Sequence, residues 1–425
     1  MPTPNLTFRD ATADDLPALY QLCYADAPGI HKTRLEDTAG GLTRFLIAEL
    51  DGVLVGFTTL VFERPAHWSD AQRSDQLPCV IDLFVKQSLR GCGAGRGIGS
   101  RFMFFLENQA RQAGFHQLYL SVDPVANAPA HRLYERLGYC SLQNEPYRDH
   151  WEFTDADGLL HQGNDWAIDL VKELPGSPAL LERCRYPGLA EPYDTALRQA
   201  VAFILDRFDA MGLLACGTIL RGNPSPSSDL DLYVIERRPQ RQRLQRFFNG
   251  VPCEIFTNPP AQIRTYFIEE QAEGTPITAH MLATGFPVLE LDPVVGELRQ
   301  QAADLLSSPP TMDPKNLFYR RYELATLLED GRDMVSADTM AASLILNDAV
   351  RGMLEFAFLS HGRHIPRRKD LVKTLLELDI SLWKEAQAYY QSADAAQRLA
   401  CAERLADLTI QAHGFFEWDG DIEEL

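Results

Sequence analysis

Apolar runs separated by turn signals mark the beginning of the chain. Phe45–Leu50 and Val53–Phe57 lie on either side of Asp51-Gly52, a dipeptide that favours the two-residue turn of a β-hairpin. A further apolar run at Cys79–Val85 predicts another strand. Apolar residues then recur at helical spacing after residue 101. The first part of the chain is therefore expected to combine strands with helices.

The middle of the chain alternates carboxylates with apolar residues. Asp229 and Asp231 stand on either side of Leu230. Alternate side chains of a strand point to opposite faces, so the two carboxylates are expected on one face and the leucine in the core. Glu254 alternates with apolar neighbours in the same way, on a later strand expected at 251–256.

The C-terminal part has a different pattern, with apolar residues at helical spacing over 337–359 and 371–390. Proline-rich stretches near 174–192 and 307–314 indicate boundaries between domains. The expected fold class is α/β and multidomain. Its expected segments are a mixed-sheet α/β domain at 1–174, a linker at 175–193, a second α/β domain at 194–306 and an α-helical bundle at 307–425.

Composition narrows the class of protein. The chain has 425 residues, 45% of them apolar, which suffices for a core in each domain. No run approaches the roughly 18 apolar residues of a membrane span, and Met1–Asn5 lacks the basic and apolar parts of a signal peptide. Eight cysteines are scattered without metal spacing, as expected of reduced thiols. These features predict a cytoplasmic protein without a membrane partner.

The net charge of −19 is spread along the chain. It argues against nucleic acid as a partner. An acidic field would attract a cationic small molecule, although an acidic surface also serves solubility alone. A small-molecule substrate, polycationic in one reading, is expected, and the oligomeric state stays open.

The paired aspartates point to a metal. Carboxylates as close as those of Asp229 and Asp231 repel each other unless a cation lies between them, and Mg²⁺ prefers such oxygen ligands together with nucleotide phosphates. Upstream, Gly217 allows a close approach of the backbone to phosphate, and Thr218 offers a hydroxyl and an amide at an expected helix start. The alternative is that the aspartates line the solvent face of an amphipathic strand.

This order of residues resembles the DNA polymerase β nucleotidyltransferase superfamily, whose motif is Gly-Ser or Gly-Gly, a spacer, and Asp-apolar-Asp-apolar. The resemblance implies that Asp229 and Asp231 hold Mg²⁺ and that Glu254 is the third metal ligand or a base. Glu254 could equally face water as an ordinary strand residue. The substrate implied is an NTP, with ATP as the first choice. The residues that the resemblance places around it are Gly217, Thr218, which replaces the commoner serine, and Ser228.

A glycine-rich loop follows the strand expected at 79–85, with five glycines between 91 and 99. Such a backbone can wrap a pyrophosphate at a helix N-terminus, but alone it is as often a flexible loop or a dinucleotide turn. Together with Asn127–Tyr139, the loop resembles the GNAT acyltransferase family, whose acyl-CoA loop reads Arg or Gln, two residues, Gly, one residue, Gly or Ala. The resemblance covers about residues 1–174 and implies acetyl-CoA as cosubstrate.

The loop matches that family motif in two registers. Counted forward from the strand, Arg90, Gly93 and Gly95 fall on the motif, whereas counting back from the helix end selects Gly97 and Gly99 without the arginine. Either the helix begins a turn early or the loop bulges. All five residues are therefore candidates for binding acetyl-CoA.

The same resemblance supplies candidates for the chemistry. Acyl transfer needs a neutral amine and a proton for the leaving thiolate. Asp82 lies where relatives keep a carboxylate that takes the amine proton, and Tyr134 matches the usual proton donor to the thiolate. Asp82 could instead merely face solvent, and Tyr134 also belongs to an apolar helical stripe. Asn127, at the start of the second motif, is an expected acetyl-CoA contact.

Three readings of the function stay open. In the first, the chain is a bifunctional transferase that acetylates an amine and transfers a nucleotide to a hydroxyl, as modification of an aminoglycoside-like antibiotic would need. The second is a toxin-antitoxin type nucleotidyltransferase that acts on RNA or protein. The third is a regulator that binds CoA or nucleotide without turnover. The first is favoured by analogy.

Overall fold

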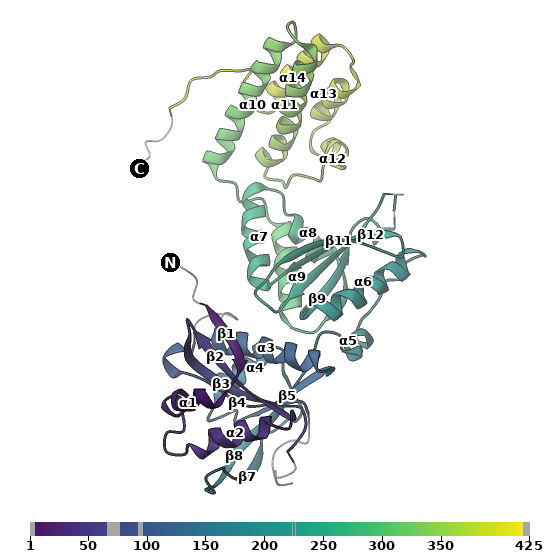
Figure 1. Ribbon diagram of the computed structural model, residues 1–425. Helices are drawn as coiled ribbons and strands as arrows, with labels where there is room; N and C mark the ends of the chain where they lie inside the picture. The colour runs from purple at the N-terminus through teal and green to yellow at the C-terminus, as the bar shows by residue number, and fades with distance from the viewer. Residues whose placement is uncertain (1–4, 66–76, 92–96, 223, 226, 420–425) are drawn as a thin grey trace. The chain divides into compact units, whose positions relative to one another are not determined.

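The fold of the protein is that of a computed structural model, which describes residues 5–65, 77–91, 97–222, 224–225 and 227–419 (Figure 1). Its elements confirm the expected α/β multidomain class with a helical C-terminal part. The chain divides into two compact units, Met1–Pro260 with Phe286–Gly296 and Ala261–Gly285 with Glu297–Leu425. The four segments expected from the sequence stay predictions. Within the described residues, every helix is too short or too polar to cross a membrane.

The first sheet has the strand order β1-β2-β3-β4-β5-β8-β6, and β7 pairs with β8. Its strands are β1 (Leu6–Asp10), β2 (Thr43–Leu50), β3 (Val53–Val61), β4 (Cys79–Val85), β5 (Gln117–Val122), β6 (Cys140–Ser141), β7 (Tyr147–Thr154) and β8 (Leu160–Glu173). Its helices are α1 (Leu16–Leu22), α2 (Gly29–Thr38), α3 (Ile98–Gln112) and α4 (Ala128–Arg136). The expected hairpin is confirmed: β2 and β3 pair antiparallel, and Asp51 and Gly52 have positive φ angles of 51° and 79°.

Alternation along β2 decides which helices cover which face of this sheet. Phe45 and Ile47 pack in one cluster with Leu19 of α1. Their neighbours Leu46 and Ala48 point the other way and belong to the larger core formed with α3. The sheet is therefore covered on both faces, with α1 on one and α3 on the other.

The parallel pairing of β4 with β5 is short. It comprises Cys79↔Tyr119 and Val80↔Leu120, although the two strands continue to Val85 and Val122. Beyond that point β4 also changes register against β3, and Asp82 has a φ of 54° in the irregular segment. A bulge of this kind re-aims the side chain that it carries. The separation of β4 from β5, together with the bulge, leaves space for a cavity between the two strands.

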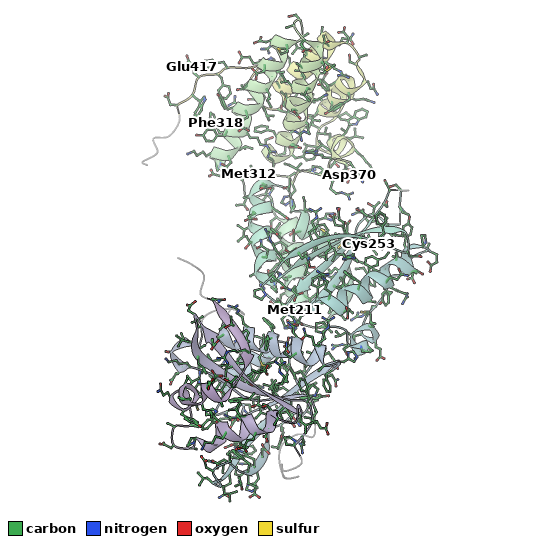
Figure 2. The ribbon with its side chains drawn as sticks, viewed as in Figure 1. Met211, Cys253, Met312, Phe318, Asp370 and Glu417 are labelled. Atoms are coloured by element: carbon green, nitrogen blue, oxygen red, sulfur yellow. The ribbon has the colours of Figure 1, made fainter. Side chains whose placement is uncertain are left out.

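The second sheet has the order β11-β12-β10-β9-β13, in which β10 and β12 are parallel. Leu230 is fully buried in a core built with α6, as the alternation predicted. Met211 of β9 and Cys253 of β12 are labelled in this sheet in Figure 2. Its elements are α5 (Pro178–Glu182), within the segment expected to be a linker, α6 (Tyr193–Arg207), β9 (Ala210–Cys216), β10 (Leu230–Glu236), β11 (Gln242–Phe248), β12 (Val251–Asn258) and β13 (Phe286–Glu290).

More helices follow, and those formed after residue 313 build a separate apolar core. None of the described residues after 306 lies in a strand, as expected of a helical bundle. The segment 371–390 forms two helices, because the Asp379 carboxylate accepts from the amides of Ser381 and Leu382 and so starts a new helix. These helices are α7 (Pro260–Glu273), α8 (Ile277–Thr284), α9 (Val294–Ser307), α10 (Pro314–Met334), α11 (Thr339–Ser360), α12 (Leu371–Leu378), α13 (Ile380–Gln391) and α14 (Ala395–Leu408).

Buried charges join the two sheets within the first unit. Lys172 Nζ of β8 lies 2.9 Å from Glu107 Oε1 of α3 and 2.6 Å from Asp209 Oδ2, directly before β9. These side chains are only 3%, 1% and 7% exposed. Arg237, which follows β10, donates a hydrogen bond to the carbonyl of Arg136 at the end of α4. Residues of both sheets thus satisfy one another's charges out of contact with water.

Candidate functional site

A cavity of about 830 Å³ lies where β4 and β5 part. Its walls come from these two strands, from α2 and α4, and from the β7–β8 hairpin. Because parted strands leave backbone N–H and C=O groups unpaired with each other, they offer a linear ligand a row of donors and acceptors. The cavity contains three of the residues singled out in the sequence: Asp82, Asn127 and Tyr134.

Asp82 faces an arginine from α2. Arg34 Nη2 donates to Asp82 Oδ2 at 2.5 Å, and the Arg34 guanidinium carbon lies 5.0 Å from the ring centre of Phe57 and 5.2 Å from that of Tyr24. Arg34 is 8% exposed, so the rings and the ion pair hold it in place. No local pattern in the sequence indicates this pair, because its members are 48 residues apart.

The arginine is held from behind by a histidine. Burial, and then the charge of Arg34, lowers the pKa of His31 to about 4, so its ring is neutral near pH 7. The Nδ1 atom can then accept from Arg34 Nη1 at 3.0 Å while Nε2 donates to the carbonyl of Cys23 at 3.1 Å. A neutral histidine therefore orients Arg34 without competing for Asp82.

Tyr134 is 6% exposed and lines the same cavity from α4. Burial, with a smaller contribution from the charge of Asp82, raises the pKa of this phenol well above its ordinary range. The hydroxyl is therefore protonated at neutral pH and can donate to an anion that forms beside it. Tyr134 thus belongs both to the apolar core of the first sheet and to the wall of the cavity.

The glycine-rich loop is described only in part, since Gly93 and Gly95 lie outside the described residues. The helix α3 begins at Ile98, so Gly97 directly precedes its first turn and Gly99 lies within it. The helix thus does not begin a turn early. Arg90 turns back to β4, where its Nε donates to the carbonyl of Val85 at 2.7 Å.

Asn127 precedes α4 and is exposed at the cavity. Its carbonyl accepts hydrogen bonds from the amides of Ala130 and His131 in the first turn of the helix. The α4 N-terminus therefore opens beside the cavity, where its free amides favour an anionic ligand group.

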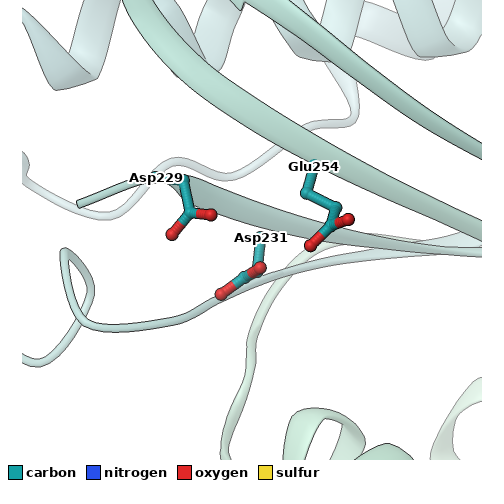
Figure 3. Close-up of side chains that lie close together, drawn as sticks. All are labelled: Asp229, Asp231 and Glu254. Carbon is teal, nitrogen blue, oxygen red and sulfur yellow. The ribbon is translucent and has the colours of Figure 1, made fainter. Parts of the chain in front are cut away.

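A second constellation lies in the other sheet. Asp229, Asp231 and Glu254 each offer a carboxylate oxygen, and these oxygens lie within 4.8 Å of one another (Figure 3). Asp229 directly precedes β10, and Asp231 is the register partner of Glu254 on the parallel neighbour β12. Pairing in parallel register is what brings together carboxylates that stand far apart in the sequence.

The pKa of Asp231 reflects the closeness of the three carboxylates. Burial, then the charges of Asp229 and Glu254, raises the pKa of Asp231 to about 6. Gly217 lies against it with a φ of 94°, and a Cβ at this position would be 2.6 Å from Asp231 Oδ2. The absence of a side chain at Gly217 thus makes room for the carboxylate, and the expected approach of this glycine to a phosphate stays a prediction.

Glu254 already has two partners. Arg243 Nε and Gln245 Nε2 both donate to its Oε1 atom, at 2.6 and 3.1 Å. A cation at this site would compete with Arg243 for that oxygen. The sequence reasoning missed both residues, although Arg243 and Gln245 stand at alternate positions of a polar strand, the pattern of a shared face.

The segment after Gly217 differs from the expectation. Thr218 begins a turn rather than a helix: its carbonyl accepts from the amide of Arg221, and the chain then reaches Pro224, which cannot continue a helix. The Ser228 hydroxyl accepts from the amide of Ser225 at 2.8 Å and so stabilises the loop before Asp229. Thr218 and Ser228 both remain close in sequence to the carboxylates, but their described contacts are within the loop.

Comparison with known proteins assigns the first of these regions. Residues 7–139 match the model of the acetyltransferase (GNAT) family. The N-terminal part of the chain is therefore a GNAT acetyltransferase domain. No curated protein matches the chain.

Solved structures of two kinds are similar to the chain. A nucleotidyltransferase-like protein from Exiguobacterium sibiricum 255-15 is 16% identical, with 51% of this chain and 73% of that chain covered and a TM-score of 0.35. An N-acetyltransferase from Staphylococcus aureus Mu50 is 18% identical, with 40% and 98% covered and a TM-score of 0.29. PaiA N-acetyltransferase from Thermoplasma acidophilum, in complex with coenzyme A, is 15% identical, with 39% and 98% covered and a TM-score of 0.28. At such scores these likenesses carry no argument about either site.

Proposed function

We propose that the protein transfers the acetyl group of acetyl-CoA to the amine of a small molecule. The observation that carries the proposal is the cavity where β4 and β5 separate, in which a carboxylate paired with Arg34, that of Asp82, and a buried phenol, that of Tyr134, line the same space. The family match of residues 7–139 supports the same activity. Gly97, Gly99 and Asn127 lie at helix N-termini suited to the phosphates of the cosubstrate.

In the proposed reaction, Tyr134 and Asp82 each have one role. The neutral amine attacks the thioester carbonyl carbon, a C–N bond forms, and the C–S bond breaks with both electrons on sulfur. The attacking nitrogen loses its extra proton to water as the amide forms. Tyr134 gives its proton to the thiolate and regains one from water, so that CoA leaves as the thiol. Asp82 binds the incoming ammonium and accepts its proton through an ordered water molecule, since one of its oxygens is already paired with Arg34.

Replacing Tyr134 tests this proposal. In Tyr134→Phe the ring and its packing are kept and only the acid is lost, so we expect kcat to fall about 100-fold while the affinity for acetyl-CoA is unchanged. Free thiol release reports kcat, and calorimetry reports binding. An unchanged kcat at every pH would remove Tyr134 from the chemistry.

A second activity, nucleotidyl transfer, is favoured by the cluster of Asp229, Asp231 and Glu254. The set suits Mg²⁺, since all three donors are carboxylate oxygens and Gly217 leaves space against Asp231. Asp229 and Asp231 would hold the ion, and Glu254 would share its oxygen with Arg243. The ion would neutralise the phosphates of an NTP, by preference ATP. The residues' own task is to orient the acceptor hydroxyl and the triphosphate.

An Asp231→Asn variant tests the second activity. We expect nucleotide addition to fall at least about 100-fold and acetyl transfer to stay unchanged, because the two sites lie in different sheets. Incubation with acetyl-CoA, and separately with each NTP and Mg²⁺, against aminoglycosides, tRNA and proteins distinguishes the acceptors by mass. Addition to RNA or protein alone would favour the toxin-antitoxin reading, and tight binding without any addition the regulator.

A further inference from the structure

We propose that Arg243 couples metal binding to nucleotide binding at the carboxylates of the second sheet. In the nucleotide-free protein its guanidinium shares Glu254 with the ion and so weakens the binding of Mg²⁺, whereas the phosphates of a bound NTP accept its hydrogen bonds instead. The inference rests on the proposed nucleotidyl transfer and concerns the regulation of the same site. It gives a positioning role to a residue outside the motif that contains Asp229 and Asp231.

The first argument is the place of Arg243 on β11, at the edge of the sheet. Glu254 on β12 has Asp231 as its register partner on one side and Gln245 on the other. Arg243 lies two residues before Gln245, and therefore on the same face, diagonally across from Glu254. Long side chains reach such diagonal neighbours. The strand pairing thus places the Arg243 guanidinium beside the three carboxylates.

The second argument is that Glu254 accepts from Arg243 and Gln245 at one and the same oxygen. Arg243 Nε lies 2.6 Å and Nη2 2.5 Å from Glu254 Oε1, and Gln245 Nε2 donates to this atom at 3.1 Å. A carboxylate oxygen has about two lone-pair sites, so these contacts occupy it. A divalent cation that uses Glu254 has to share the carboxylate with a guanidinium, and the two positive charges repel each other.

The third argument is that the arginine is near the carboxylate but weakly held. The Arg243 side chain is 65% exposed and that of Glu254 14%, and water competes for ion pairs with so exposed a partner. The Arg243 guanidinium carbon also lies 5.0 Å from the ring centre of Phe256, its register partner on β12. This ring keeps the guanidinium at the cluster when its bond to Glu254 breaks. Arg243 can therefore change its partner without leaving the site.

A triphosphate is the partner that suits this change. The planar guanidinium donates two parallel hydrogen bonds to phosphate oxygens, and opposite charges strengthen them. In the proposed activity, the phosphates of the NTP bind the ion held by Asp229 and Asp231, so they bring negative charge to the cluster beside which Arg243 lies. Once Arg243 contacts phosphate, the Glu254 oxygen is released for the ion. The metal and the nucleotide then each favour the binding of the other.

The test measures metal and nucleotide binding separately in the full-length protein. Mn²⁺ is the probe of the metal site and is followed by electron paramagnetic resonance. The α,β-methylene analogues of the four common NTPs are the nucleotide probes, because they bind without nucleotidyl transfer, and calorimetry follows them in saturating Mn²⁺. In Arg243→Gln we expect the dissociation constant for Mn²⁺ alone to fall about fivefold or more, and that for the analogue to rise about tenfold. A residue that only stabilises the fold would not change the two affinities in opposite directions.

Arg246→Gln is the matched control, because it removes the same charge from β11 on the opposite face. There the Arg246 guanidinium carbon lies 4.8 Å from the ring centre of Phe203 of α6. At physiological salt, which screens exposed charges that are not in contact, we expect both dissociation constants to stay within about twofold of the wild type.

The outcomes separate the inference from the activity on which it rests. If Arg243→Gln leaves either dissociation constant unchanged, or changes both no more than Arg246→Gln does, the coupling role is wrong and the proposed nucleotidyl transfer stands. If the wild-type protein does not bind Mn²⁺, or binds none of the analogues in its presence, the proposed nucleotidyl transfer fails, and the inference fails with it.

Discussion

At the scale of single residues, Gly217 shows how a backbone position controls a carboxylate that belongs to another strand. Its φ of 94° is accessible to glycine at little cost, and the space beside it is filled by Asp231. Any side chain at this position would meet both constraints at once. The glycine is therefore needed for the geometry of the cluster as much as for the turn.

We predict that Gly217→Ala lowers nucleotidyl transfer about tenfold or more, because the new methyl group displaces the Asp231 carboxylate. Gly222→Ala is the matched control, since Gly222 also has a positive φ, of 79°. Apart from its chain neighbours, no atom of the described residues lies within 4 Å of the position that a Cβ would take there. Both variants carry a similar backbone strain of about 1–2 kcal/mol, and Gly217→Ala adds the clash with Asp231, so its melting temperature should fall at least as far as that of the control. Equal nucleotidyl activity in the two would contradict the steric role of the position.

Arg34 acts through shape as well as charge, because its planar guanidinium lies among rings while one nitrogen binds Asp82. We predict that Arg34→Lys lowers kcat/KM for acetyl transfer about tenfold despite the retained charge. Arg9→Lys, at an ion pair in which Arg9 is 42% exposed, should have no effect. Full activity of Arg34→Lys in steady-state assays would mean that charge alone suffices.

At the scale of elements, the packing of α2 should depend on pH, because His31 on this helix is buried in its neutral form. The folded pKa of about 4 is below the ordinary value of 6.5, so the unfolded chain binds a proton first as the pH falls. The contribution to stability is complete above pH 6.5 and is lost on acidification from pH 6.5 to 4.

We therefore predict that the free energy of unfolding, measured with urea, decreases by about 2–3 kcal/mol between pH 6.5 and 4 through this residue. In His31→Gln, which cannot titrate, the part of the slope that belongs to His31 should be missing, although the variant is less stable throughout. Equal slopes for the two proteins in this window would show that His31 does not titrate as inferred.

Features set by neighbouring residues could be predicted from the sequence, whereas features set by contacts between distant segments could not. The hairpin around Asp51-Gly52 and the buried Leu230 followed from local pattern and turn chemistry, which act over a few residues. Asp229, Asp231 and Glu254 were expected to cooperate, and the structure brings them together. The prediction of a helix starting at Thr218 was wrong. The chain forms a turn there, because Pro224 does not allow a helix to continue.

The remaining features depend on pairing between distant segments. Arg34 meets Asp82, and Arg243 meets Glu254, only because a helix and a strand pack in one particular register. The aromatic and acidic lining contributed by β7 and β8 has no local pattern that distinguishes it from a surface hairpin. Long-range packing of this kind leaves no periodic trace in one sequence.

At the scale of the whole molecule, the charges around Lys172 connect the two sheets of the first unit. Each charge is tolerated in the interior only because its partners are present. We predict that Lys172→Met destabilises the protein by about 3–5 kcal/mol, since it removes the nearest cation from the buried Glu107 and Asp209, which keep only the longer contacts of 4.0 Å to Arg238 and 3.7 Å to Arg237. Thermal melting or urea unfolding measures the loss.

The control for this prediction is Arg111→Met. Arg111 pairs with Asp206 between the same two regions, but the side chains are 36% and 68% exposed, so the expected cost is below about 1 kcal/mol. If both variants lost the same stability, burial would not be what distinguishes the Lys172 cluster.

The hydrogen bond from Arg237 to the carbonyl of Arg136 has a practical consequence. Arg136 ends the helix that carries Tyr134, so the C-terminus of a helix in the acetyltransferase domain is hydrogen-bonded by a residue about 100 positions downstream. A fragment cut near residue 174 would lack that cap and the Asp209 carboxylate. The first domain produced alone would therefore lack contacts that α4 and Lys172 make in the longer chain.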